Sequence, residues 1–135
     1  MKAAALLQKS REKLRYADYL ISQALRLKDS TILHSGIKAI TESAEATLTA
    51  LLTNERELKR GPAFGESFEM KIELFKEWAA RQNLSQKYSL FLAELKDSVK
   101  RASIGNEWAK KSLAMAKELL EKVESFISTS SGEQG

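Results

Sequence analysis

The chain of 135 residues contains no cysteine and only one histidine, His34. The lack of cysteine excludes disulfide bonds, thiolate metal ligands and thiol chemistry. A single histidine cannot supply the Glu-x-x-His pairs of a di-iron bundle or the usual ligand spacing of a zinc site. The phosphate-binding patterns GxxxxGK[ST] and GxGxxG are also missing. We therefore expect no cofactor and no metal.

Long apolar runs are missing as well. No stretch approaches the roughly 18 apolar residues that a membrane-spanning helix needs. Residues 3–7 form a run of five apolar residues before Gln8, which is shorter than the apolar core of about 7–15 residues in a signal peptide. These features predict a soluble, cytoplasmic protein without a membrane partner.

Proline and glycine are scarce, and they are concentrated at one place. The segment 59–65 holds the only proline, Pro62, and two of the six glycines. Glycine followed by proline is a strong helix stop, because glycine takes the left-handed conformation and proline cannot continue the helix. Gly61 is therefore predicted to adopt a left-handed conformation at the end of a long helix.

On both sides of this break, apolar residues recur at spacings of three, four and seven, which is typical of amphipathic helices. Either Asp29 or Ser30 can cap the second helix, Ser67 and Ser85 are suitable N-cap residues further on, and Asn83 suits a helix exit. Gly36 lies near the start of the second helix, where it allows a close helix approach or a kink. The predicted helices span residues 3–27, 31–59, 67–82, 85–102 and 107–127.

The predicted fold class is all-α, a five-helix up-and-down bundle. The first two helices form a long antiparallel hairpin, and three shorter helices pack against it. Residues 1–127 form one domain, and residues 128–135 lack an apolar anchor and are predicted to be a disordered tail.

The net charge of +4 is unevenly distributed. Residues 1–60 carry 11 basic and 7 acidic residues, whereas residues 61–135 carry 11 of each. The excess in the first helix predicts, as one alternative, phosphate contacts with RNA or DNA, or an acidic protein partner. The other interpretation is a solvated helix face. The candidate nucleic-acid-binding residues are Lys9, Arg11, Lys13 and Arg15.

Carboxylates on helices are the remaining candidates for chemistry. Glu42 and Glu45 are three residues apart and so share one surface of a helix. Acid–base work requires burial or crowding that separates their pKa values, so structural ion pairs are favoured. For Asp18 the expected partner is Arg15 or Lys38.

Two segments carry a resemblance to a known family. Residues 11–20, together with Lys59-Arg60-Gly61-Pro62-Ala63-Phe64 and Glu66-Ser67-Phe68-Glu69, resemble small uncharacterised archaeal helical proteins with the organisation of the HEPN superfamily. The resemblance covers roughly residues 10–100. It implies a long helical hairpin with shorter helices and a dimer.

Catalytic HEPN proteins resemble one another in an Arg followed by four to six residues and then His, which cleaves RNA. Here the only candidate pair, Arg26 and His34, has seven intervening residues and crosses the Asp29-Ser30 turn. A degenerate nuclease is therefore only a remote alternative, and no catalytic residue is predicted.

The favoured hypothesis is a non-enzymatic interaction module that forms a homodimer. The second helix is longer than three short neighbours can easily cover, so part of its apolar stripe is expected at the surface. The residues predicted at the dimer interface are Tyr19, Leu33, Ile37 and Ile40.

Overall fold

A computed structural model describes residues 2–98, 100–101 and 103–134, with the side chains of 130–134 excepted. Its elements are α1 (Lys2–Leu27), α2 (Ser30–Glu57), α3 (Phe68–Arg81), α4 (Lys87–Ser98) and α5 (Asn106–Gln134). Within the described residues there is no β-strand, so the all-α prediction is confirmed. None of the described helices is both long and apolar enough to cross a bilayer.

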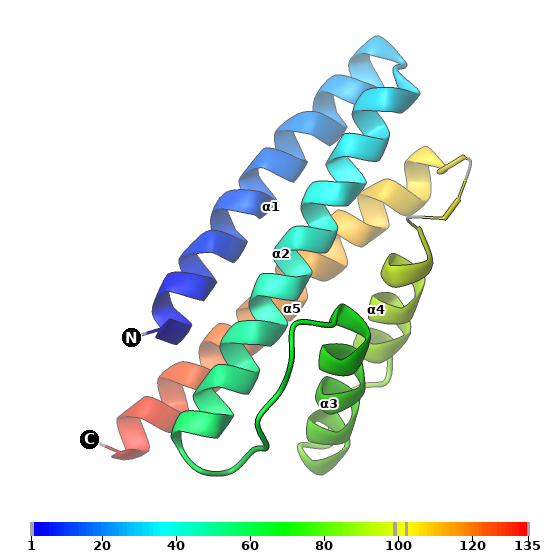
Figure 1. Ribbon diagram of the computed structural model, residues 1–135. Helices are drawn as coiled ribbons and strands as arrows, with labels where there is room; N and C mark the ends of the chain where they lie inside the picture. Colours follow the sequence, from blue (N-terminus) through cyan, green and yellow to red (C-terminus); the bar gives the residue numbers. More distant parts are fainter. Residues whose placement is uncertain (1, 99, 102, 135) are drawn as a thin grey trace.

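Figure 1 shows how the helices are arranged. α1 and α2 run antiparallel as a long hairpin, α5 lies along both, and the short pair α3 and α4 packs on the other side of α2. The predicted hairpin is therefore present. α5 was predicted to be one of three shorter helices, but with 29 residues it is as long as α2, which has 28. Within the described residues the bundle therefore has three long helices, α1, α2 and α5.

The turn between α1 and α2 forms for the predicted reason. Asp29 is the N-cap of α2, and its carboxylate accepts hydrogen bonds from the backbone amides of Thr31 and Ile32 at 2.9 and 3.1 Å. These amides have no partner inside the helix, so the cap satisfies them. Lys28 supplies the left-handed residue of the turn, with φ of 54°.

α1 and α2 approach each other closely at two places. A Cβ added to Gly36 would lie 2.8 Å from Cγ1 of Ile21, so only glycine fits without movement. Further along, the Ser10 hydroxyl lies 2.9 Å from the Ser43 hydroxyl and 2.6 Å from the Thr47 hydroxyl. These buried hydroxyl groups satisfy one another's hydrogen bonds. The register of the two helices therefore depends on small side chains at these positions.

The end of α2 differs from the prediction. Lys59, not Gly61, adopts the left-handed conformation, with φ of 59°. The amide of Arg60 donates to the carbonyl of Glu55 at 2.8 Å and that of Lys59 to Arg56 at 3.0 Å, which is a Schellman motif. Gly61 is closely packed instead: a Cβ there would lie 3.1 Å from the Cβ of Glu55, so a larger residue would require a small shift of Glu55.

The short helices begin and end close to the predicted residues. The Ser67 hydroxyl accepts from the amide of Met70, the Ser85 hydroxyl accepts from the amide of Lys87, and Asn83 leaves α3 with φ of 57°. α4 ends at Ser98. The predicted end near Ala102 was too late, since Lys100 and Arg101 are already outside the helix; Ala102 itself lies outside the described residues.

The last helix is longer than predicted. Residues 128–134 continue α5, where a disordered tail was expected, and Gly135 lies outside the described residues. Thr129 shows how polar residues are accommodated, because its hydroxyl donates to the carbonyl of Ser125 at 2.9 Å. A hydroxyl side chain in a helix can bond the carbonyl one turn back, so the polar group of Thr129 is satisfied within α5.

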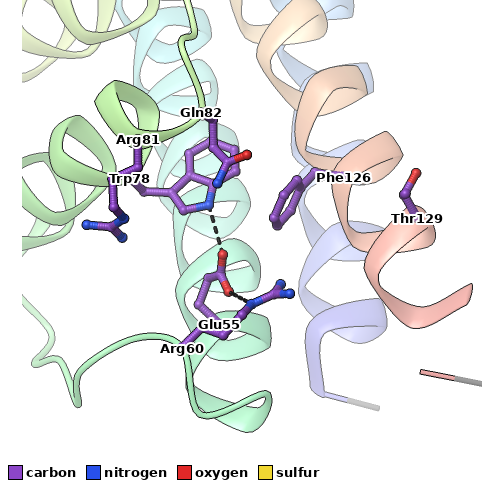
Figure 2. Close-up of a pocket in the computed structure, with 7 residues that line it drawn as sticks. All are labelled: Glu55, Arg60, Trp78, Arg81, Gln82, Phe126 and Thr129. Carbon is purple, nitrogen blue, oxygen red and sulfur yellow. Dashed lines mark hydrogen bonds and ion pairs between the residues drawn. The ribbon is translucent and has the colours of Figure 1, made fainter. Parts of the chain in front are cut away.

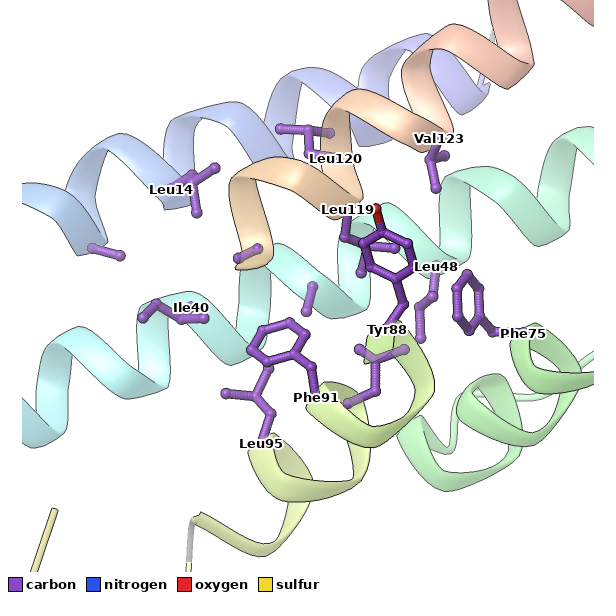
Figure 3. Packing of buried hydrophobic residues seen from close by; sticks show 14 of the residues in the cluster. Leu14, Ile40, Leu48, Phe75, Tyr88, Phe91, Leu95, Leu119, Leu120 and Val123 are labelled. Carbon is purple, nitrogen blue, oxygen red and sulfur yellow. The ribbon is translucent and has the colours of Figure 1, made fainter. Parts of the chain in front are cut away.

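The core lies between α2 and the helices packed around it. Figure 3 shows Leu48 of α2, Phe75 of α3, Tyr88 of α4 and Leu119 of α5 meeting there. All four are fully buried. Each lies in the apolar periodicity of its own helix, as expected of an inward-facing position.

Tyr88 is a core residue whose polar end reaches out of the apolar region. Its hydroxyl donates to the carboxylate of Glu118 at 2.8 Å, and Lys87 donates to the same oxygen at 2.7 Å. Burial, followed by the bond to Glu118, raises the pKa of Tyr88 to about 12. Hydrogen bonds from Lys87 and then Tyr88 lower the pKa of Glu118.

The close approach at Gly36 gives a first prediction. Gly36→Val should lower the free energy of unfolding by about 1–3 kcal/mol, because the added atoms overlap Ile21 in a packed interface. Equilibrium urea unfolding measures the change. Ser35→Val is the matched control, since Ser35 is exposed on the same helix and should change stability little. Equal losses in both variants would contradict the close approach.

The Tyr88–Glu118 bond gives a prediction about pH. The pKa of Tyr88 is raised in the folded state, so its contribution is complete below about pH 10 and is lost as pH rises through about 12. The stability advantage of the wild-type protein over Tyr88→Phe should therefore shrink between these values. Urea unfolding of both proteins at matched pH measures it, and a difference independent of pH would contradict the assignment.

Candidate functional site

A pocket of about 350 Å³ opens at the end of the bundle where α2, α3 and α5 come together (Figure 2). α2 and the turn that follows it, the end of α3, and the last turns of α5 provide its lining. The lining residues are Glu55, Arg60, Trp78, Arg81, Gln82, Phe126 and Thr129.

Glu55 lies at the centre of this pocket, and its side chain is 7% exposed. One carboxylate oxygen accepts from the indole N–H of Trp78 at 2.8 Å, and the other accepts from Nε of Arg60 at 2.7 Å. A buried carboxylate is costly unless it is paired and hydrogen-bonded, and here each oxygen has a donor. The Schellman motif places Arg60 beside Glu55, so the backbone conformation brings the two side chains of the ion pair together.

Aromatic rings complete the contact between the three helices. Trp78 and Phe126 meet edge to face, with ring centroids 4.8 Å apart at 82°, and the guanidinium of Arg60 lies 5.6 Å from the centroid of Phe126. Such edge-to-face and cation–π contacts add to the stabilisation from burial. Glu55 and its partners therefore join α2, α3 and α5.

The chemistry available at this pocket is limited by those contacts. Because Trp78 and Arg60 each hold one oxygen of Glu55, the carboxylate is arranged as a structural ion pair. In the part of the chain that the structure describes, no group of three or more histidine, aspartate or glutamate side chains is placed to hold a metal ion. The pocket was not predicted, because its residues come from three separated segments with no shared motif.

The candidate nucleic-acid residues do not form one surface. Arg11 donates to Glu124 of α5 at 2.7 Å, and Lys13 forms an ion pair with Glu42 of α2, also at 2.7 Å. The bond to Glu42 raises the pKa of Lys13. Arg11 and Lys13 thus lie on opposite flanks of α1, and both are used in contacts between helices. Lys9 and Arg15 remain exposed.

The carboxylates singled out in the sequence also form ion pairs, as favoured above. Glu45 lies 3.9 Å from Lys71, and Asp18 forms an ion pair with Lys117 at 3.3 Å rather than with Arg15 or Lys38. Lys38 was the wrong partner because α5, not α2, flanks that side of α1, and Lys117 of α5 takes the pairing position. Nδ1 of His34 lies 2.7 Å from the carbonyl of Ser30, within the first turn of its own helix.

Three of the four predicted interface residues are buried inside the chain. Leu33, Ile37 and Ile40 are only 4, 3 and 0% exposed, so they do not form a surface with Tyr19. The premise was that short helices would leave part of α2 uncovered. The long helices α1 and α5 instead cover it, and these residues belong to the core.

Exposed apolar side chains gather on α1 instead. Tyr16, Tyr19 and Leu27 are 55, 60 and 54% exposed, and they make up three of the five large exposed hydrophobic residues among those that the structure describes. Of the described helices, only α2 and α5 pack against α1, so its opposite face is open (Figure 1). That open face is the candidate interaction surface, and it contains Tyr19.

Five residues form a row along this face, the outer seam of α1. Successive members are separated alternately by four and three residues, which is the spacing of the contact positions in a coiled coil. The seam could have been found in the sequence as a second stripe on the first helix, away from the apolar one. Its members are Glu12, Tyr16, Tyr19, Gln23 and Arg26.

Comparison of the chain with protein-family models, with curated proteins and with solved structures found no match. The HEPN-like organisation therefore stays a prediction, and function is inferred below from the geometry of the described residues.

The Glu55 contacts predict a difference between the two tryptophans. Trp78→Phe should lower the free energy of unfolding by about 1–3 kcal/mol, because it removes a hydrogen-bond donor from a buried carboxylate. Trp108→Phe is the control, since Trp108 donates at 3.1 Å to Glu94 in an exposed position and should lose less. Urea unfolding followed by circular dichroism compares them, and an equal or smaller loss for Trp78→Phe would contradict a structural role.

Proposed function

We propose that the protein is a non-enzymatic interaction module that forms a homodimer through the open face of α1. The observation that carries this proposal is the row of exposed large side chains on a helix face that no described helix covers. Tyrosine is enriched at protein interfaces, because its rigid ring buries apolar area while its hydroxyl tolerates water.

The arrangement of titratable side chains supports a role without catalysis. Asp18, Glu42, Glu45 and Glu55 each form an ion pair within the chain, and His34 bonds to a backbone carbonyl. Side chains paired in this way stabilise the bundle rather than bind a substrate. A cytoplasmic location belongs to the same proposal, since a chain without cysteine does not depend on an oxidising compartment.

RNA binding is not favoured by the same observations. Two of the four candidate residues, Arg11 and Lys13, are used in ion pairs on opposite sides of α1. Phosphate binding gains most from several cations on one surface. Nucleic acid or an acidic protein as a partner stays a prediction from the sequence.

Self-association can be tested directly. The wild-type protein should sediment as a dimer at high concentration and dissociate on dilution, whereas the double variant Tyr16→Ser with Tyr19→Ser should remain monomeric. Both tyrosines are exposed, so the helical circular dichroism should not change. Analytical ultracentrifugation over a range of concentrations measures the dissociation constant.

Leu90→Ser provides the matched control, because Leu90 is an equally exposed hydrophobic residue on α4, away from the face of α1. This variant should dimerise as the wild type does. A wild-type protein that stays monomeric at every concentration would contradict the proposal, as would loss of the dimer in Leu90→Ser with none in the tyrosine variant.

A further inference from the structure

We infer that two copies of the chain pair their α1 helices antiparallel about a two-fold axis at Tyr19, with Glu12 of each copy opposite Arg26 of the other. This inference rests on the proposed function, because it specifies the geometry of the homodimer. The outer seam of α1 thus packs against the same seam of a second copy of the chain.

The first argument is the position of the seam on the helix. With about 100° of rotation per residue, its five residues centre roughly 170° from the buried residues of α1, such as Leu14 and Ile21. A second helix can therefore approach without meeting α2 or α5. From Glu12 to Arg26 the seam is about 21 Å long, at ~1.5 Å per residue.

The second argument is charge. Glu12 and Arg26 lie seven residues before and seven residues after Tyr19, so a two-fold axis at Tyr19 brings each beside the other on the partner copy. Among the described residues, Glu12 accepts only from the side-chain amide of Gln8, at 3.2 Å, and Arg26 donates to Gln23. Neither has an ion-pair partner among the described residues.

The same charges disfavour the parallel alternative. A parallel pairing in register would place Glu12 against Glu12 and Arg26 against Arg26, and like charges across an interface act against that arrangement. The antiparallel arrangement replaces two repulsive contacts with two attractive ones. It also places Tyr19 against Tyr19 on the axis, where the two rings can stack.

Cysteine cross-linking tests the axis, and the chain is suited to it because it contains no cysteine. Under mild oxidation, Tyr19→Cys should form a disulfide-linked dimer, since a residue on a two-fold axis meets its own copy. Glu12→Cys is the control: its two copies would be about 21 Å apart in the antiparallel pair but adjacent in a parallel one.

A charge exchange tests the register. Glu12→Arg should raise the dissociation constant of the dimer at least about tenfold, because it places two cations opposite each other. Adding Arg26→Glu to that variant restores opposite charges and should return the dissociation constant close to that of the wild type. The difference between single and double variants should shrink at high salt.

The outcomes separate this inference from the proposed function. Cross-linking at position 19 with rescue by the double variant supports the antiparallel pair. A tyrosine-dependent dimer that cross-links at position 12, or is not rescued, overturns the arrangement and leaves self-association through α1 intact. A wild-type protein without any dimer overturns both.

Discussion

The close approach of α1 to α2 is the constraint on which the rest of the structure depends. With glycine at position 36, Ile21 approaches to a distance that a larger residue would not permit. The Ser10, Ser43 and Thr47 hydroxyls fit between the helices only because they are small. Two contacts at separate points along a helix pair fix both its register and the rotation of α1. That rotation decides which face of α1 is buried and which is open.

The second constraint lies at the other end of α2, where Glu55 brings α3 and α5 against it. Its carboxylate can be buried because Trp78 and Arg60 supply both donors, and it would be costly without them. The pocket around it is therefore better understood as a junction between helices than as a place for chemistry. With α5 anchored there through Phe126, the stripe of α2 is covered along its length.

Local signals in the sequence predict the helices and their caps well. Asp29, Ser67 and Asn83 act as expected, because capping depends on neighbouring backbone groups alone. The errors concern distant packing or competing local choices. Lys59 takes the left-handed position that was predicted for Gly61, and Gly61 instead lies in close contact with Glu55. The junction around Glu55 could not be predicted, since three segments must fold before it exists.

The interface prediction failed for a related reason, and the open face of α1 is the surface proposed in its place. Apolar periodicity identifies the stripe that a helix buries in its own chain, which is where Leu33, Ile37 and Ile40 belong. A surface used for reversible association must instead remain compatible with water, which favours tyrosines and charges of both signs over a continuous apolar row. The outer seam of α1 has that composition. Its contribution to association would come from Tyr16 and Tyr19, and its specificity would come from the positions of its charges.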